Sequence, residues 1–106
     1  MFLRYQGSAY TRFVRATDHD DVLGAEIAAR ELPHLNLKDA LRLVALYARA
    51  GNRKYDRAAQ RWLVRLLEEQ SVTLDETRVA CEWLSMLAGP DGDLALGSLA
   101  GLVYRP

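Results

Sequence analysis

The stretch that decides the fold is residues 36–70, NLKDALRLVALYARAGNRKYDRAAQRWLVRLLEEQ. It predicts two helices folded back on each other around the break at residues 51–54, GNRK. In the first helix, residues 37–50, the polar side chains Lys38, Arg42 and Arg49 form one narrow strip, and the remaining surface is apolar. Such a helix must be covered by neighbours on several sides. We therefore expect it at the centre of the domain.

The ends of this first helix carry clear local signals. Asn36 precedes it and is a plausible N-cap, because its side-chain oxygen can accept a hydrogen bond from an otherwise unpaired backbone N–H. Asp39 adds a negative charge in the first turn, where the helix dipole favours one. Gly51 supplies the left-handed residue at which helices commonly end.

The second helix, residues 55–70, is amphipathic. Its polar side carries mainly charged residues, and its apolar residues recur at helical spacing. We expect it to be half buried. The apolar face consists of Tyr55, Ala58, Ala59, Trp62, Leu63 and Leu66.

A hairpin of helices is expected before this stretch. Residues 1–7 are predicted to be an arm whose Phe2, Leu3 and Tyr5 lie on the body, followed by a short helix at residues 9–16. A β-hairpin across residues 6–8 is the alternative for this region. A second helix at residues 21–32 follows a polar break and ends before Pro33, because the residue before a proline disfavours helical geometry.

A third hairpin is expected after it. Thr73 and Glu76 form a capping box, in which the threonine bonds forward to an N–H and the glutamate bonds back. The helix that it opens, residues 74–88, stops at the turn 89–92, and a mostly apolar helix at residues 93–104 ends the chain. The sequence thus predicts a single all-α domain, residues 1–106, of three stacked αα-hairpins (8–33, 36–70 and 73–104) with about six helices.

The central hairpin carries a repeat-like pattern. Leu43, Tyr47 and Gly51 recur every four residues and are followed by Tyr55 and Ala58. Over residues 41–67 this pattern resembles the tetratricopeptide repeat, apart from two extra residues in the turn between Gly51 and Tyr55. The resemblance implies a TPR-like stack of helical hairpins that binds other proteins. The chain as a whole resembles small all-helical bacterial proteins of unassigned function.

Composition narrows the function classes. The formal net charge is +0, which argues against a body that is electropositive overall and wraps nucleic acid. The single cysteine cannot form an internal disulfide, and no apolar run approaches the length of a membrane helix or signal peptide. We expect a soluble cytoplasmic protein with no membrane contact.

The most informative candidate site is a basic stripe on the second helix of the central hairpin. Arg57, Arg61 and Arg65 stand four residues apart, so like charges face each other at a cost of a few tenths of a kcal/mol per pair. Elsewhere, charges at this spacing can pair, as in Glu26 with Arg30, Asp39 with Arg42 and Arg78 with Glu82. The candidate partner-binding residues are Arg53, Lys54, Arg57, Arg61, Val64 and Arg65. A merely solvated face is the alternative.

No catalytic or metal motif stands out. His19 lies among Asp18, Asp20 and Asp21, but the spacing fits no calcium loop and helix capping explains the carboxylates. Cys81 has no histidine near it in the sequence and is expected to be an inert, partly buried thiol. We expect no enzyme activity, no metal and no cofactor.

The sequence therefore favours a non-catalytic protein-interaction or regulatory adaptor module whose partner has an acidic surface. Nucleic-acid binding through the same basic stripe is the alternative. An exposed Val64, together with apolar residues near the two ends of the chain, also leaves room for a homodimer.

Overall fold

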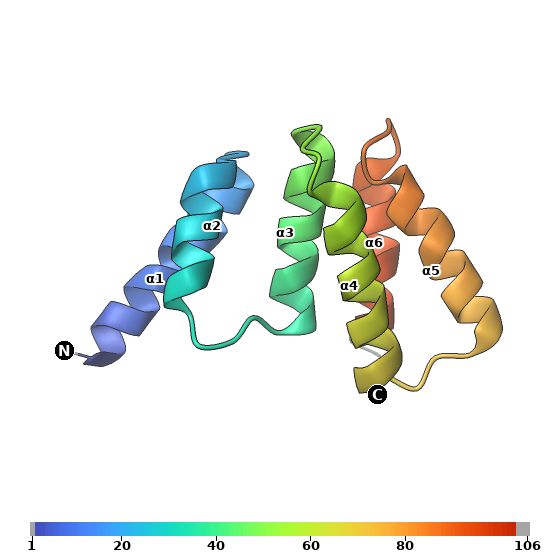
Figure 1. The fold of residues 1–106 in the computed structure, drawn as a ribbon, viewed down its shortest axis with the longest axis horizontal. Helices are drawn as coiled ribbons and strands as arrows, with labels where there is room; N and C mark the ends of the chain where they lie inside the picture. Colours follow the sequence, from blue (N-terminus) through green and yellow to red (C-terminus); the bar gives the residue numbers. More distant parts are fainter. Residues whose placement is uncertain (1, 104–106) are drawn as a thin grey trace.

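The computed structural model describes residues 2–103, with side chains from residue 9 onward. This part of the chain is all α-helical, as predicted, and its helices stand as three hairpins side by side along the 46 Å long axis (Figure 1). The helices are α1 (Phe2–Asp18), α2 (Val22–Glu31), α3 (Leu37–Arg49), α4 (Tyr55–Glu69), α5 (Leu74–Met86) and α6 (Gly92–Val103).

Helix α3 lies at the centre, as its nearly all-round apolar surface predicts. Figure 1 shows it standing between the α1–α2 hairpin and the group formed by α4, α5 and α6. Leu41 and Val44 face one way, into a core shared with those three helices, and Leu46 faces the other way, into a smaller core with Phe13 and Ala25 of the first hairpin. The side chain of Leu46 is fully buried. The fold therefore contains two apolar cores joined by one helix.

The predicted helix ends are confirmed. The side chain of Asn36 accepts a hydrogen bond from the backbone N–H of Asp39 at 2.8 Å, and Gly51 adopts the left-handed conformation with φ of 62°. Both halves of the capping box form, because Thr73 accepts from the N–H of Glu76 at 3.1 Å and Glu76 accepts from the N–H of Thr73 at 2.8 Å. Such caps satisfy backbone groups that a helix cannot pair internally.

The predicted break between an N-terminal arm and a helix that begins at residue 9 is wrong. Residues 2–7 belong to α1, which runs without interruption through Gly7 and Ser8 to Asp18. One glycine costs a helix only about 1 kcal/mol relative to alanine, which is too little to end it when the following turns pack well. Two predictions concern parts of the chain outside those described. They are the packing of the Phe2, Leu3 and Tyr5 side chains on the body and the end of the last helix at residue 104.

The polar strip of α3 faces a neighbouring helix rather than solvent alone. Arg49 donates to Asp20 at 2.8 Å and to the backbone carbonyl of Thr17 at 3.0 Å. Arg42 lies 3.5 Å from Asp18 and 3.8 Å from Asp39, so that it bridges α1 and α3. Asp39 is buried and also accepts a hydrogen bond from the Tyr10 hydroxyl. The seam between the first hairpin and α3 is therefore apolar at its centre and ionic along one side.

The two-core arrangement predicts that the first hairpin can open separately. Leu46→Ala should cost about 2–5 kcal/mol of unfolding free energy and should remove hydrogen-exchange protection mainly from α1 and α2. Leu66→Ala, at an equally buried position in the other core, should instead expose amides of α4, α5 and α6. Equal loss of protection along the whole chain in both variants would show that the two cores form one cooperative unit.

Candidate cation-lined groove

The candidate site is built on α4, whose orientation is fixed by contacts on its buried side. The Trp62 indole N–H donates to the backbone carbonyl of Leu37 at 2.8 Å, and the Tyr55 hydroxyl donates to the carbonyl of Leu84. Trp62 and Leu66 are buried in the main core, as the amphipathic pattern predicts. These anchors turn the opposite side of α4, which carries the basic residues, away from the body.

Three guanidinium groups define what we call the cation row, namely Arg53, Arg57 and Arg61. All three residues are exposed, and none forms an ion pair with a carboxylate among the side chains that the structure describes. Asp56 is adjacent to Arg57 in sequence, but consecutive residues point about 100° apart around a helix and do not face each other. The row is therefore a group of three cations without direct ion pairs to the described side chains.

The other two predicted cations are already paired. Lys54 Nζ lies 2.7 Å from a carboxylate oxygen of Glu26 on α2. Arg65 Nε lies 2.9 Å from a carboxylate oxygen of Glu69, one helical turn further along α4. The remaining candidate, Val64, is exposed as expected, at 53%. Of the five predicted cations, three arginines thus form no ion pair within the described part of the chain, whereas Lys54 and Arg65 each form one.

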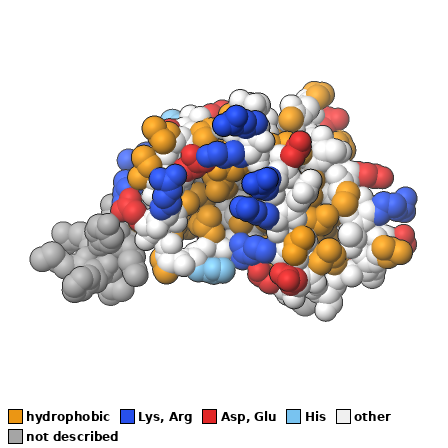
Figure 2. Space-filling model, viewed as in Figure 1, with side chains coloured by type: hydrophobic (Ala, Val, Ile, Leu, Met, Phe, Trp, Pro, Cys, Tyr) orange, Lys and Arg blue, Asp and Glu red, His pale blue; other side chains and the backbone are white. Residues whose placement is uncertain are grey.

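A groove of about 590 Å³ adjoins the cation row. All three arginines line it, together with Tyr47 of α3 and with Lys54 and Ala58. Figure 2 shows Lys and Arg side chains in a column down the middle of this face, beside a hollowed surface of hydrophobic side chains. A ligand at this position would meet guanidinium groups on one side and apolar carbon on the other.

Glu26 binds two of the residues that line this groove, and this role was not identified from the sequence. Its carboxylate accepts hydrogen bonds from the Tyr47 hydroxyl at 2.5 Å and from Lys54 at 2.7 Å. The bond from Lys54, followed by that from Tyr47, lowers the pKa of Glu26 below its ordinary value. Burial, followed by the bond to Glu26, raises the pKa of Tyr47. Both groups therefore keep their present charges at neutral pH.

Sequence spacing favoured a different partner for Glu26. Arg30, one turn along α2, satisfies the usual rule for helix pairs, whereas the actual partners are 21 and 28 residues away. The signal that could have indicated this contact is Tyr47 itself, a hydroxyl within an otherwise apolar face of α3 that needs a partner once it is buried.

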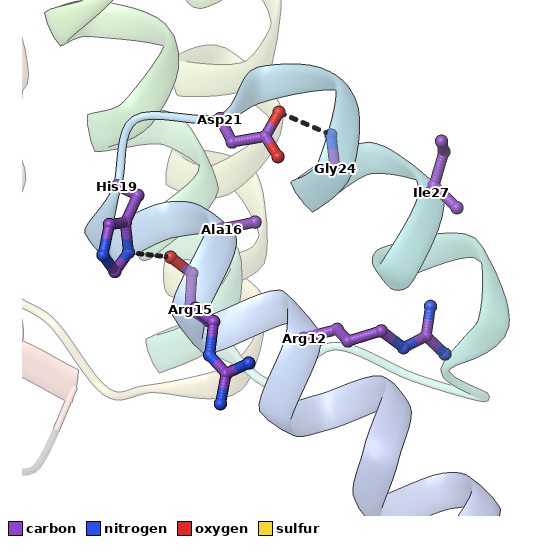
Figure 3. Close-up of a pocket in the computed structure, with 7 residues that line it drawn as sticks. All are labelled: Arg12, Arg15, Ala16, His19, Asp21, Gly24 and Ile27. Carbon is purple, nitrogen blue, oxygen red and sulfur yellow. Dashed lines mark hydrogen bonds between the residues drawn. The ribbon is translucent and has the colours of Figure 1, made fainter.

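A second hollow, of about 410 Å³, lies over α1 and α2 (Figure 3). Its polar groups serve local structure. Asp21 accepts from the N–H of Gly24 at 2.9 Å as the N-cap of α2, and His19 Nδ1 donates to the carbonyl of Arg15 at 2.8 Å. Arg12 binds Glu31 through two hydrogen bonds, at 2.8 and 3.0 Å. Figure 3 shows these side chains diverging rather than meeting at one point.

The other candidate residues are structural or exposed. Within residues 9–103, no three His, Cys, Asp or Glu side chains lie close enough together to hold a metal ion. Cys81 is exposed rather than partly buried, and His34 is exposed in the turn after Pro33. Arg78 pairs with Asp75 at 3.6 Å instead of with Glu82.

Comparison with protein-family models, with curated proteins and with solved structures gives no match to this chain. The resemblance to tetratricopeptide repeats therefore stays a prediction. Among the helices described, none combines the length and the apolar character needed to cross a lipid bilayer.

The lowered pKa of Glu26 gives a prediction about pH. A group whose pKa is lowered by folding stabilises the protein above its unfolded pKa, here about 4.5, and this stabilisation is lost as the pH falls through the folded value. Glu26→Gln should therefore lower the unfolding free energy by about 1 kcal/mol near neutral pH. The difference from the wild type should shrink below pH 4.5.

Urea unfolding at a series of pH values measures this difference. Glu82→Gln is the matched control, because Glu82 is exposed and forms no ion pair among the described side chains. A Glu26→Gln difference that stays constant from neutral pH to well below pH 4.5 would contradict the role assigned to the carboxylate charge.

Proposed function

We propose that this protein is a non-catalytic binding module whose cation row receives an acidic segment of a partner protein. The observation that carries the proposal is that Arg53, Arg57 and Arg61 all lack carboxylate partners and all line one groove. Guanidinium groups bind carboxylates with two parallel hydrogen bonds, and these charge-assisted bonds are among the stronger ones in proteins. A segment with two or three carboxylates would satisfy the row.

The charges that surround the row favour a short acidic segment over nucleic acid. Arg57 and Arg61 are about 6 Å apart along α4, at the usual 1.5 Å per residue, and Arg53 lies in the turn before this helix. Glu68 and Glu69 follow beyond the row, and Glu26 binds Lys54, the residue after Arg53. Duplex DNA carries one negative charge per roughly 1.7 Å of its axis. A duplex laid along α4 would bring its phosphates over these carboxylates.

The groups in the groove support a binding role rather than catalysis. Tyr47 lines the groove and its hydroxyl donates to Glu26, so each of these two titratable groups is engaged by the other. The raised pKa of Tyr47 and the lowered pKa of Glu26 move both groups away from proton transfer near neutral pH. We place the module in the cytoplasm, where an exposed free thiol such as that of Cys81 is kept reduced.

The proposal predicts that reversing the row abolishes binding of an acidic peptide. A fluorescein-labelled peptide of alternating Glu and Gly should bind the wild type in a fluorescence-polarisation assay. Arg57→Glu together with Arg61→Glu should weaken this binding at least about tenfold, because two charge-assisted pairs become repulsive. The matched control is Arg15→Glu together with Arg78→Glu, which makes the same change in net charge elsewhere on the surface.

Two outcomes would contradict the proposal. Equal peptide binding by the row variant and the wild type would show that the row is ordinary solvated surface. Binding of duplex DNA, but not of the peptide, with an affinity that falls steeply with salt and is lost in the row variant, would assign the row to nucleic acid instead.

A further inference from the structure

Two exposed apolar side chains continue the cation row along α4. Val64 follows Arg61 by three residues, and Leu67 follows Val64 by three. Val64 is 53% exposed and Leu67 is 45% exposed. Offsets of four and seven residues place Arg57, Arg61 and Val64 in one stripe, with Leu67 beside it. We call Val64 and Leu67 the apolar pair.

Core packing does not account for the exposed surface of the apolar pair, and helix propensity does not account for Val64. The core side of α4 is formed by Trp62 and Leu66, which are buried, whereas Val64 and Leu67 are exposed. A β-branched valine is a poorer helix former than lysine, glutamate or alanine, because its side chain loses rotational freedom against the preceding turn. A polar residue would therefore serve the isolated domain at least as well as valine at position 64. Single exposed apolar residues are common, but here two of them directly extend a row of unpaired arginines.

The outer side of α4 limits the kind of segment that can bind there. The face of a helix offers side chains only, and the described part of the chain contains no strand edge to pair with an extended peptide. A segment that buries its backbone against this face must satisfy its own N–H and C=O groups. An α-helix does so, and an amphipathic helix laid along a complementary stripe is an established mode of peptide recognition.

We propose that the partner segment is an acidic amphipathic helix that lies along α4. Two of its carboxylates, one turn apart, bind Arg57 and Arg61, and two apolar side chains further along the same face pack on Val64 and Leu67. This inference rests on the proposed function and adds to it the conformation of the ligand and its apolar contact. Charge complementarity requires the acidic half of the partner helix to lie over Arg57 and Arg61.

Three labelled peptides of the same composition, each about 16 residues long, test the inference, since shorter isolated helices are marginal in water. The first has a pair of glutamates four residues apart, followed by a pair of leucines on the same face. The second has its leucines moved to the opposite face. The third has the first sequence with two central residues replaced by their D-enantiomers, which break the helix. We expect the first peptide to bind at least about tenfold more tightly than the other two.

Variants of the protein separate the apolar contact from the ionic one. Val64→Ser together with Leu67→Ser should lower the affinity for the first peptide to that for the second, and should leave the second unchanged. Leu23→Ser together with Ile27→Ser is the matched control, because these α2 residues are 66% and 45% exposed. This control should bind all three peptides like the wild type. Circular dichroism and thermal melting establish that each variant is folded.

The outcomes distinguish this inference from the proposed function. Equal binding of all three peptides, or normal binding of the first peptide by the apolar-pair variant, would overturn the amphipathic-helix partner. If binding were still lost on reversal of Arg57 and Arg61, the acidic-segment function would stand. Failure of every acidic peptide to bind would overturn both. A wild-type dimer that the apolar-pair variant converts to a monomer, measured by sedimentation, would assign the pair to self-association and overturn the inference.

Discussion

The whole arrangement depends on the need to cover α3 on two sides. Its apolar side chains point in two directions, so no single neighbouring hairpin can bury them all. Helices α4, α5 and α6 cover one side, and α1 with α2 covers the other through Leu46. Because burying apolar surface is the main favourable contribution to folding, α3 takes its central position by burying one side against each neighbour. The chain is therefore one domain in which one helix is shared between two cores.

The groove lies where the first hairpin and α4 pack against different sides of α3. The first hairpin packs against α3, while α4 packs against a different side of the same helix (Figure 1). The space between α2 and α4 is bridged at one end by Glu26, which binds α3 through Tyr47 and the start of α4 through Lys54. Tyr47 of α3 therefore lines the groove beside the cation row. The contacts of Glu26 thus link the first hairpin to two residues that line the candidate site.

Local chemistry was sufficient to predict the helices and most of their ends. Asn36, Gly51 and Thr73 act on backbone groups within a few residues of themselves, so their effects are visible in a short window of sequence. The same windows misjudged the N-terminal region, where Gly7 and Ser8 resemble a break but the helix continues. The prediction there followed the weak tendency of Gly7 and Ser8 to end or begin a helix. In the structure, the summed stability of the adjoining turns outweighs this tendency.

The ionic contacts could not be predicted in the same way. Arg49 and Asp20 are 29 residues apart, and Arg42 and Asp18 are 24 apart, so the pairing depends on how the hairpins stack. Helical spacing suggested partners on the same helix, and this rule succeeded for Asp39 with Arg42 but failed for Glu26. The candidate site could accordingly be predicted only in part. The spacing predicted that the arginines lie on one face of α4, but the tertiary structure was needed to show which cations remain unpaired.

This distribution of pairs explains how a chain with no net charge can present a positive groove. The acidic residues Asp18, Asp20 and Glu26 are held at the seam by Arg42, Arg49 and Lys54, and so they are not available to neutralise the cation row. Equal totals of acidic and basic residues therefore conceal an uneven arrangement. At physiological ionic strength the field of the exposed arginines is screened within about 8 Å. The row thus acts on a ligand in contact with it, through directed hydrogen bonds, and contributes little to attracting one from a distance.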